Sequence, residues 1–213
     1  MILQKRKVRG RGPVIYLNRL PKAKMIEAIL QDFLNRPVKG FRVLDIGCGN
    51  GGISEYFSRN NNQYAVDIND MRNNKEAGFN FSLVDSEKLS FSDGFFDIIL
   101  SHHVIEHVEN QDLHLDEIKR VLKPIGICYL ATPNKSSPIM EGHVGNNKVF
   151  RYREMVPFFQ KHGYDCHEYG VKVFREPKKF FGEKQYGKFF PLFLAHMLKP
   201  LFPSQIFILK PNA

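Results

Sequence analysis

Residues 43–52 read VLDIGCGNGG. The apolar run 43–46 has the character of a buried strand, a turn with four glycines follows it, and a helical run, ISEYFSR, comes next. Glycine lets the backbone adopt positive φ and lets a ligand approach closely, while a helix N-terminus offers unpaired N–H donors. The stretch therefore predicts a strand–turn–helix site for a nucleotide-like ligand.

Asp45 distinguishes between two ligands of such a turn. Gly47, Gly49 and Gly52 match G-x-G-x-x-G, a fingerprint of dinucleotide pyrophosphate binding. A carboxylate just before the first glycine would repel a pyrophosphate, whereas it would attract the sulfonium and ammonium groups of S-adenosylmethionine. We therefore favour S-adenosylmethionine, with S-adenosylhomocysteine as the product, over a nicotinamide dinucleotide.

The length and composition of the chain favour one α/β domain. The chain has 213 residues, enough for a full core in a single domain. Basic residues open the chain without an apolar stretch behind them, and no run approaches the length of a membrane span, so we expect a cytoplasmic protein. Cys48, Cys128 and Cys166 lack metal-ligand spacing and fit reduced thiols, so no metal site is predicted.

The formal net charge of +9 is concentrated toward the two ends of the chain. Only basic charges occur before residue 25, and lysines outnumber acids after Phe174. Such a distribution suits a nucleic acid, an anionic membrane surface or an acidic substrate as partner, and it equally suits a solubilising basic surface. The charge alone leaves these alternatives open.

Apolar strands alternate with amphipathic helices along the chain. Strands are expected at 42–46, 63–68, 80–84, 96–101, 127–132, 166–174 and 205–211, and helices at 24–36, 53–59, 71–77, 113–122 and 153–164. Strands separated by helices form βαβ units with right-handed crossovers. The predicted fold is therefore a single Rossmann-like, doubly wound α/β domain, whose mostly parallel seven-stranded sheet has an antiparallel last strand.

This fold divides the chain into four segments. A basic segment with a helix (1–37) precedes the cofactor-binding core (38–174), and a helical insertion (175–204) precedes the last strand (205–213). The insertion contains an apolar run, 189–202, that is too short to span a bilayer. We expect the insertion to close the substrate pocket or pack on a partner subunit, with an interfacial membrane helix as the alternative. No oligomeric state is predicted.

The order of motifs resembles the class I S-adenosylmethionine-dependent methyltransferases, specifically the small-molecule group called type 11. The glycine turn is similar to the first motif of that family, VDI (66–68) to its second-strand acid, and 83–108 to its adenine-side and fourth-strand motifs. RVLKPIGICYLATPN (120–134) is similar to the fifth motif, and IFILKP fits the last strand of the family. The resemblance runs from about Val38 to Gly163 and implies binding of S-adenosylmethionine.

Ten residues are expected to contact this cofactor. Asp67 ends the second strand, where its carboxylate can accept hydrogen bonds from both ribose hydroxyls, with capping of the next turn as the alternative. Asp85 and Ser86 are similar to the adenine-contacting pair of the family, with a loop cap as the alternative for Asp85. Ser101 and His102 follow at the end of the fourth strand. The full set is Asp45, Gly47, Cys48, Gly49, Asp67, Ile68, Asp85, Ser86, Ser101 and His102.

In-line methyl transfer needs an aligned nucleophile, and it needs a base where the acceptor is a hydroxyl. His143, in the loop after the fifth strand, is the first candidate for a base or an acceptor-orienting group, and His103, at the exit of the fourth strand, is the second. Glu141 and Tyr152 are the expected pocket partners, and a loop or packing role is the alternative for each of these four residues. Asp97, in contrast, is expected to have a structural role at the start of the fourth strand.

Three functions follow from these patterns. The leading hypothesis is transfer of a methyl group to oxygen, nitrogen or carbon of a small-molecule or lipid-linked acceptor, for example a sugar. Methylation of RNA or another nucleic acid is suggested by the net charge of +9, but ATPN stands where base methyltransferases have an NPPY-type motif. A non-catalytic module that binds the cofactor and a partner is the third hypothesis, and the presence of both Asp45 and Asp67 argues against it.

Overall fold

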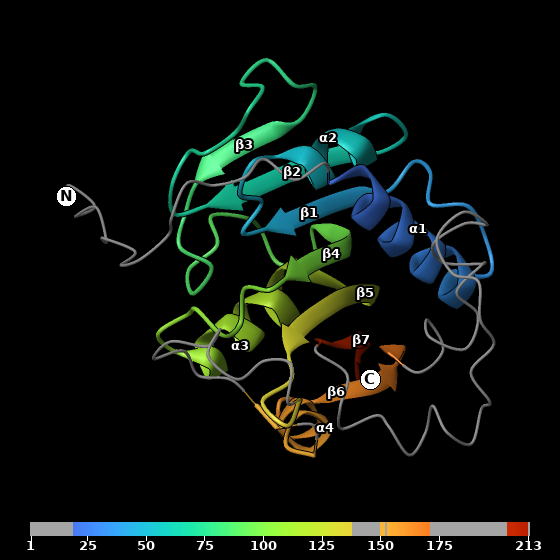
Figure 1. Cartoon of the computed structure of the whole chain (residues 1–213), viewed down its shortest axis with the longest axis vertical. Coiled ribbons are helices and arrows are strands. Elements are labelled where there is room, and N and C mark those ends of the chain that lie inside the picture. Colours follow the sequence, from blue (N-terminus) through green and yellow to red (C-terminus); the bar gives the residue numbers. More distant parts are fainter. Residues whose placement is uncertain (1–18, 138–149, 152, 171–203, 213) are drawn as a thin grey trace.

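The computed structural model in Figure 1 describes residues 19–137, 150–151, 153–170 and 204–212. In this part of the chain seven strands form one sheet in the order β3-β2-β1-β4-β5-β7-β6. The strands are β1 (Arg42–Ile46), β2 (Asn62–Asp67), β3 (Asn80–Leu83), β4 (Phe96–His102), β5 (Leu122–Pro133), β6 (Tyr164–Glu168) and β7 (Ser204–Pro211). The helices are α1 (Leu20–Leu34), α2 (Gly52–Ser58), α3 (Gln111–Val121) and α4 (Met155–Lys161).

The pairing of the strands confirms the predicted sheet. β1 pairs in parallel with β2 and β4, β2 with β3, and β4 with β5. β7 runs antiparallel to both β5 and β6. From β1 the chain builds outward to β2 and β3 on one side, and it then returns to place β4 on the other side. The strand order therefore reverses between β1 and β4, which is where open α/β sheets bind their ligands.

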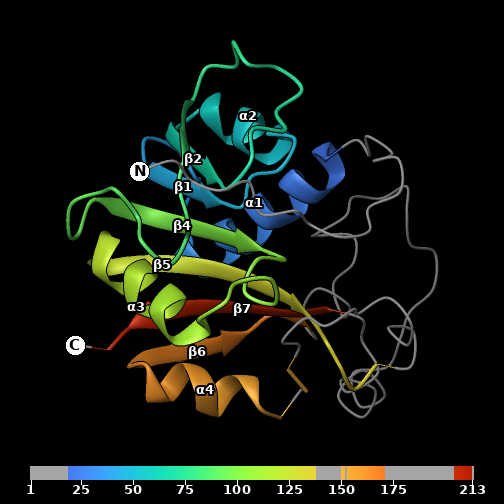
Figure 2. The same cartoon turned by 90° about the vertical axis from the view of Figure 1, so that its left-hand side faces the viewer.

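Helices cover both faces of the sheet (Figures 1 and 2). On one face, α1 and α2 pack on alternate strand residues such as Val43 and Tyr129. On the other face, α3 and α4 pack on the intervening residues, such as Leu44 and Leu130. Strands buried on both faces are expected to be nearly continuous apolar runs, and β1, β4 and β5 have this character.

The helix predicted at 71–77 is wrong, because turns occupy this segment. The side chains of Asp67, Asp70 and Asn74 each accept a hydrogen bond from the backbone N–H two residues ahead, at 3.0, 3.3 and 3.0 Å. Such local bonds from Asp and Asn offer the backbone an alternative to helix. The segment after β2 is therefore a series of turns.

Several boundaries differ from those predicted. α1 begins at Leu20 rather than at residue 24, and β5 begins at Leu122, directly after α3, rather than at 127. β6 covers 164–168, earlier than the predicted 166–174, of which 171–174 lie outside the described residues. Except for Ser204, the insertion 175–204 also lies outside them, so its helical character stays a prediction.

Asp97 has the predicted structural role at the start of β4. Its Oδ2 accepts a hydrogen bond from the backbone N–H of Arg42 at 2.9 Å, and its Oδ1 forms an ion pair with Lys123 Nζ at 2.5 Å. These contacts join the beginnings of β1, β4 and β5, at the edge of the sheet opposite to the glycine turn. Among the described helices, none is both long and apolar enough to cross a bilayer.

Candidate cofactor and catalytic site

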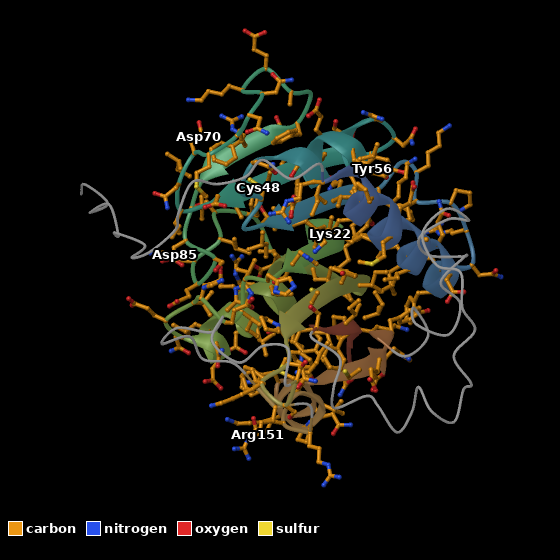
Figure 3. The ribbon with its side chains drawn as sticks, viewed as in Figure 1. Lys22, Cys48, Tyr56, Asp70, Asp85 and Arg151 are labelled. Atoms are coloured by element: carbon orange, nitrogen blue, oxygen red, sulfur yellow. The ribbon has the colours of Figure 1, made fainter. Side chains whose placement is uncertain are left out.

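The predicted cofactor residues come together at the edge where the parallel strands end. The glycine turn follows β1, Asp67 ends β2, Asp85 follows β3, and His102 ends β4. Figure 3 labels Cys48 in the turn between β1 and α2, and Asp85 in the segment after β3. Because β1 and β4 flank the point where the strand order reverses, this edge is the candidate site.

The glycine turn is fastened to β2 and packs closely on the segment after β4. The N–H groups of Gly47 and Cys48 both donate to the carbonyl oxygen of Val66, at 2.8 and 3.2 Å. Gly47 has φ +67°, and a Cβ added to it would lie 2.6 Å from Cγ2 of Val104. Glycine at this position therefore allows both the turn and the close approach of residues 103–106, which directly follow β4 and are called the β4 exit below. Burial raises the pKa of the Cys48 thiol above its usual range.

Asp67 locks the turn to the end of β2. Its Oδ2 accepts a hydrogen bond from the N–H of Gly49, which has φ +55°, at 2.9 Å, and its Oδ1 accepts one from Asn69. Asp67 therefore caps the turn that follows β2, which is the alternative role given for it. Each carboxylate oxygen can accept a second hydrogen bond. Acceptance of hydrogen bonds from ribose hydroxyls is therefore compatible with the cap and stays a prediction. The next residue, Ile68, is 49% exposed and presents an apolar side chain at this edge.

Asp45 is buried beneath the glycine turn. The hydroxyl of Ser54, on α2, donates to its Oδ2 at 2.5 Å. Burial raises the pKa of Asp45 to about 7; the hydrogen bond from Ser54 and the charge of Arg19 oppose this rise, and the charge of Asp67 adds to it. The charge of Asp45 therefore changes near neutral pH, and its predicted attraction for the methionine half of the cofactor depends on pH.

Two cations at the start of α1 lie at this site, and the sequence analysis did not single them out. A Cβ added to Gly52 would lie 3.0 Å from Cβ of Arg19, so the stem of Arg19 covers the first residue of α2. Burial lowers the pKa of Lys22, and the charge of Arg19 lowers it further. Among the described residues, no carboxylate forms an ion pair with either cation. No spacing in the sequence separates these two from the other basic residues before residue 25.

The end of β4 places two histidines side by side. Ser101 is fully buried, and the ring of His102 stacks on that of Tyr129, with 6.0 Å between the ring centroids. Burial lowers the pKa of His102 well below its usual value, and the charges of His103, Lys22 and Arg19 lower it further. The Nε2 atom of His102 is buried and has no hydrogen-bond partner in the described part of the chain. His102 is therefore uncharged at neutral pH.

His103 is held where β4, β5 and β7 meet. It has φ +58°, and its backbone N–H donates to the carbonyl oxygen of Ala131 on β5 at 2.8 Å. Its Nδ1 lies 3.1 Å from Oε1 of Glu106, and its Nε2 lies 3.5 Å from Oγ of Ser204, the first residue of β7. The imidazole side chain is 31% exposed. The ring of His103 is therefore partly exposed to solvent, with Glu106 beside one nitrogen and Ser204 beside the other.

The segment after β3 has the predicted loop cap. Oδ1 of Asp85 accepts a hydrogen bond from the N–H of Glu87, and the carbonyl oxygen of Asp85 accepts one from Lys88, both at 3.0 Å. Ser86 is buried. Contact of Asp85 and Ser86 with adenine stays a prediction.

The first candidate base, His143, lies outside the described residues, as do Glu141 and Tyr152. Of the two predicted bases, only His103 has a described environment. In the ranges that the structure describes, no cluster of three or more His, Cys, Asp or Glu side chains could hold a metal ion.

The chain is similar to known methyltransferases in sequence. A family model described as a methyltransferase domain matches residues 17–171. The ubiquinone biosynthesis O-methyltransferase of Agrobacterium fabrum is 34% identical over 112 residues, which are 48% of this chain and 44% of that protein. The chain therefore spans less than half of the length of this curated relative.

Two solved structures are similar at low sequence identity. A Burkholderia thailandensis 1,6-didemethyltoxoflavin-N1-methyltransferase with bound S-adenosylhomocysteine has a TM-score of 0.58 at 16% identity, covering 90% of this chain and 79% of that one. The [4+2]-cyclase SpnF has a TM-score of 0.60 at 18% identity, covering 92% and 82%. One is named a methyltransferase and the other a cyclase, so the shared fold does not by itself determine the reaction.

Proposed function

Because the chain belongs to the methyltransferase-domain family, as the match over residues 17–171 shows, we propose that it transfers a methyl group from S-adenosylmethionine to a hydroxyl oxygen of a small-molecule acceptor. The predicted resemblance to methyltransferases is thereby confirmed. The choice of oxygen is supported by the name of the O-methyltransferase relative. The observation that supports the proposal most is the packing of Val104, the residue after His103, directly on Gly47 of the glycine turn.

The residues at the edge of the sheet fit S-adenosylmethionine. Its ribose hydroxyls are assigned to the carboxylate of Asp67, and its adenine to the apolar surface of Ile68 and to Asp85 and Ser86. The backbone of Gly47, Cys48 and Gly49, with that of Ser101 and His102, borders the methionine half. S-adenosylhomocysteine, the product, has the same groups without the methyl.

The charged residues of the site suit the two ends of the methionine half. We assign its ammonium to the side of the site nearest to the carboxylate of Asp45. We assign its α-carboxylate to Arg19 and Lys22, because both are unpaired among the described residues and burial makes the charge of Lys22 costly without an anion. The dinucleotide alternative places a pyrophosphate beside Asp45, where its charge is unfavourable.

His103 is the proposed base, and His143, in the predicted loop after the fifth strand and outside the described residues, is the alternative. The cofactor supplies a methyl group on a positively charged sulfur, so the protein needs chiefly to align the acceptor and exclude water. His103 directly follows β4, its side chain is 31% exposed, and we assign its ring to the acceptor hydroxyl. A base in this place favours a hydroxyl acceptor, because an amine or an activated carbon depends less on proton removal.

The acceptor class extends to lipid-linked hydroxyl compounds, since the curated relative is named for ubiquinone biosynthesis. The apolar run 189–202, which lies outside the described residues, is the segment expected to contact such an acceptor or a membrane surface. A cytoplasmic location, with contact to a membrane surface as an alternative, stays part of this proposal.

Calorimetry and a transfer assay test the proposal. We expect S-adenosylmethionine and S-adenosylhomocysteine to bind and NAD not to bind, and we expect methyl transfer to at least one member of a panel of phenolic and sugar hydroxyl acceptors. Gly49→Arg is the blocked control, because residue 49 has φ +55° and its N–H bonds Asp67. Binding of NAD in place of S-adenosylmethionine would overturn the assignment. Salt-sensitive methylation of RNA, with no small acceptor used, would favour the nucleic-acid alternative.

A further inference from the structure

Glu106 is a buried carboxylate to which the proposed function has so far given no role. Its side chain is 2% exposed, at the end of the β4 exit. Oε1 lies 3.1 Å from Nδ1 of His103, and Oε2 accepts a hydrogen bond from the hydroxyl of Thr132, a fully buried residue of β5, at 3.3 Å. In the described part of the chain, no lysine or arginine forms an ion pair with Glu106. Burial of a carboxylate without such a partner is unfavourable unless other groups compensate it.

We propose that Glu106 positions His103 as the base of the methyl transfer, an inference that rests on the proposed function. A carboxylate can only accept, so the nitrogen that faces it, Nδ1, must carry the proton. The lone pair of the neutral ring is then on Nε2, which points away from Glu106 and lies 3.5 Å from the hydroxyl oxygen of Ser204. The hydrogen bond that Nδ1 donates to Glu106 in this way selects the tautomer and the orientation of the imidazole ring.

The segment 103–106 connects His103 and Glu106 to the glycine turn. Val104 packs at the position that a Cβ of Gly47 would occupy, and Ile105 is fully buried in the core. The N–H of His107 donates to the carbonyl oxygen of Val104 at 2.8 Å, which closes the turn that brings Glu106 back toward His103. A shift of the glycine turn would therefore shift the base with it.

The proton and the charges balance in the proposed step. The acceptor oxygen forms a bond to the methyl carbon as the carbon–sulfur bond breaks and sulfur keeps the electron pair, while the acceptor proton passes to Nε2 of His103. The resulting imidazolium lies against the carboxylate of Glu106, so the buried negative charge gains its counter-charge during the transfer. The hydroxyl of Thr132 keeps Oε2 in place throughout. The protonated His103 then returns its proton to water.

His107 is the other histidine near this carboxylate. Its Nε2 lies 3.9 Å from Oε1 of Glu106, beyond hydrogen-bond distance, and its side chain is 45% exposed. His103 is closer at 3.1 Å. Glu106 therefore acts on His103, and substitution of His107 provides a matched control.

Imidazole nitrogen-15 NMR of the full chain tests the positioning without any acceptor. We expect His103 in the Nδ1–H tautomer, and we expect Glu106→Met, which removes the acceptor, to shift it toward the Nε2–H tautomer. His103→Asn assigns the signal, and His107→Gln is expected to leave it unchanged. An unchanged tautomer in Glu106→Met, or a signal that follows His107→Gln instead, would overturn the proposal.

Kinetics separate positioning from a purely structural role. Glu106→Gln is expected to lower kcat by about a hundredfold, at the lower end of what general bases contribute, with the KM for S-adenosylmethionine unchanged. Its Tm is expected to stay or rise, because the substitution removes a buried charge, and Glu106→Asp should recover part of kcat. A fall in Tm with kcat unchanged in the folded fraction would overturn the role. A shift of tautomer in a protein that transfers no methyl group would instead refute the proposed function while the His103–Glu106 contact stands.

Discussion

The two halves of the candidate site are built by different means. At the glycine turn, ten consecutive residues supply the strand, the turn and the start of α2, and backbone N–H groups make most of the contacts. At the β4 exit, side chains from separate strands converge, with His103 after β4, Thr132 on β5 and Ser204 on β7. The first half is local in sequence, whereas the second exists only when the sheet has formed.

The two halves of the site are therefore sensitive to different kinds of substitution. Changes at the turn act through backbone conformation and reach both halves, because Gly47 touches Val104. Changes at the β4 exit act on single side chains and leave the turn in place. Substitutions of graded severity test whether the two halves separate in this way.

Gly47→Ala is expected to have the largest effect. The added Cβ meets Cγ2 of Val104 at 2.6 Å and forces a non-glycine residue to φ +67°. Overpacking together with the left-handed conformation predicts a loss of about 2–4 kcal/mol in the free energy of unfolding. Urea unfolding at constant pH measures this loss.

The matched control for this substitution is Gly78→Ala. Gly78 has no heavy atom within 4 Å of an added Cβ, and its φ is not in the left-handed region. Its free energy of unfolding should stay within about 0.5 kcal/mol of the parent protein. Equal losses in the two variants would contradict the close packing between the two halves.

Asp45→Asn tests the buried charge beneath the glycine turn. Burial raises the pKa of Asp45 to about 7, and a positively charged ligand favours the ionised form, so affinity for S-adenosylmethionine should rise as the pH rises from 5.5 to 7.5. We expect the Asn variant to bind about tenfold more weakly at pH 7.5, equivalent to about 1.4 kcal/mol, and to lose this pH dependence. Calorimetry across the pH range measures both changes.

The same shift in pKa predicts the opposite trend for the free protein. A carboxyl group whose pKa in the folded protein is about 7, above its usual value of 3.8, makes the fold less stable as the pH rises from about 4 toward 7. Asp45→Asn should remove this part of the pH dependence of unfolding. A parent protein whose ligand affinity is the same at pH 5.5 and 7.5 would contradict the role of the Asp45 charge.

Much of the fold is predictable from sequence, because each buried strand is an apolar run that ends at a polar or glycine-rich turn. Strands β1 and β4 start and end within one residue of their predicted bounds. The segment 71–77 is the exception, since asparagine and aspartate side chains satisfy the backbone there in turns. The early start of β5 at Leu122 is also hidden in the sequence, because Lys123 and Pro124 follow it and have the character of a helix stop.

The candidate site likewise has a part that the sequence predicts and a part that it does not. The contact between Asp67 and Gly49 joins two motifs that the sequence analysis assigns to the same cofactor. The contact between Glu106 and Thr132 spans 26 residues, and that between His103 and Ser204 spans 101. No periodicity connects such positions, and only the order of β4, β5 and β7 in the sheet brings them together.

Arg120→Met probes the segment after β3, to which we assign contact with adenine. The guanidinium donates to the carbonyl oxygens of Leu89 and Phe91, both at 2.8 Å, and so holds the segment 85–94 on α3. Since the side chain is about one-third exposed, we expect a loss of about 1 kcal/mol in unfolding free energy, with weaker binding of S-adenosylmethionine. Arg59→Met, at an exposed arginine outside this segment, is the control and should leave binding unchanged.

The smallest expected effect comes from Lys22 and Lys24, which lie two residues apart on α1. Burial lowers the pKa of Lys22 at the candidate site, whereas Lys24 is exposed. Lys22→Gln should weaken binding of S-adenosylmethionine about threefold, or about 0.7 kcal/mol, because one of two cations assigned to the methionine carboxylate is lost. Lys24→Gln should leave the affinity unchanged, as calorimetry at fixed salt would show. Equal weakening in both variants would mean that the general positive charge of α1, rather than Lys22 itself, acts on the ligand. Arg19 and Lys22 would then not belong to the half of the site that the glycine turn forms.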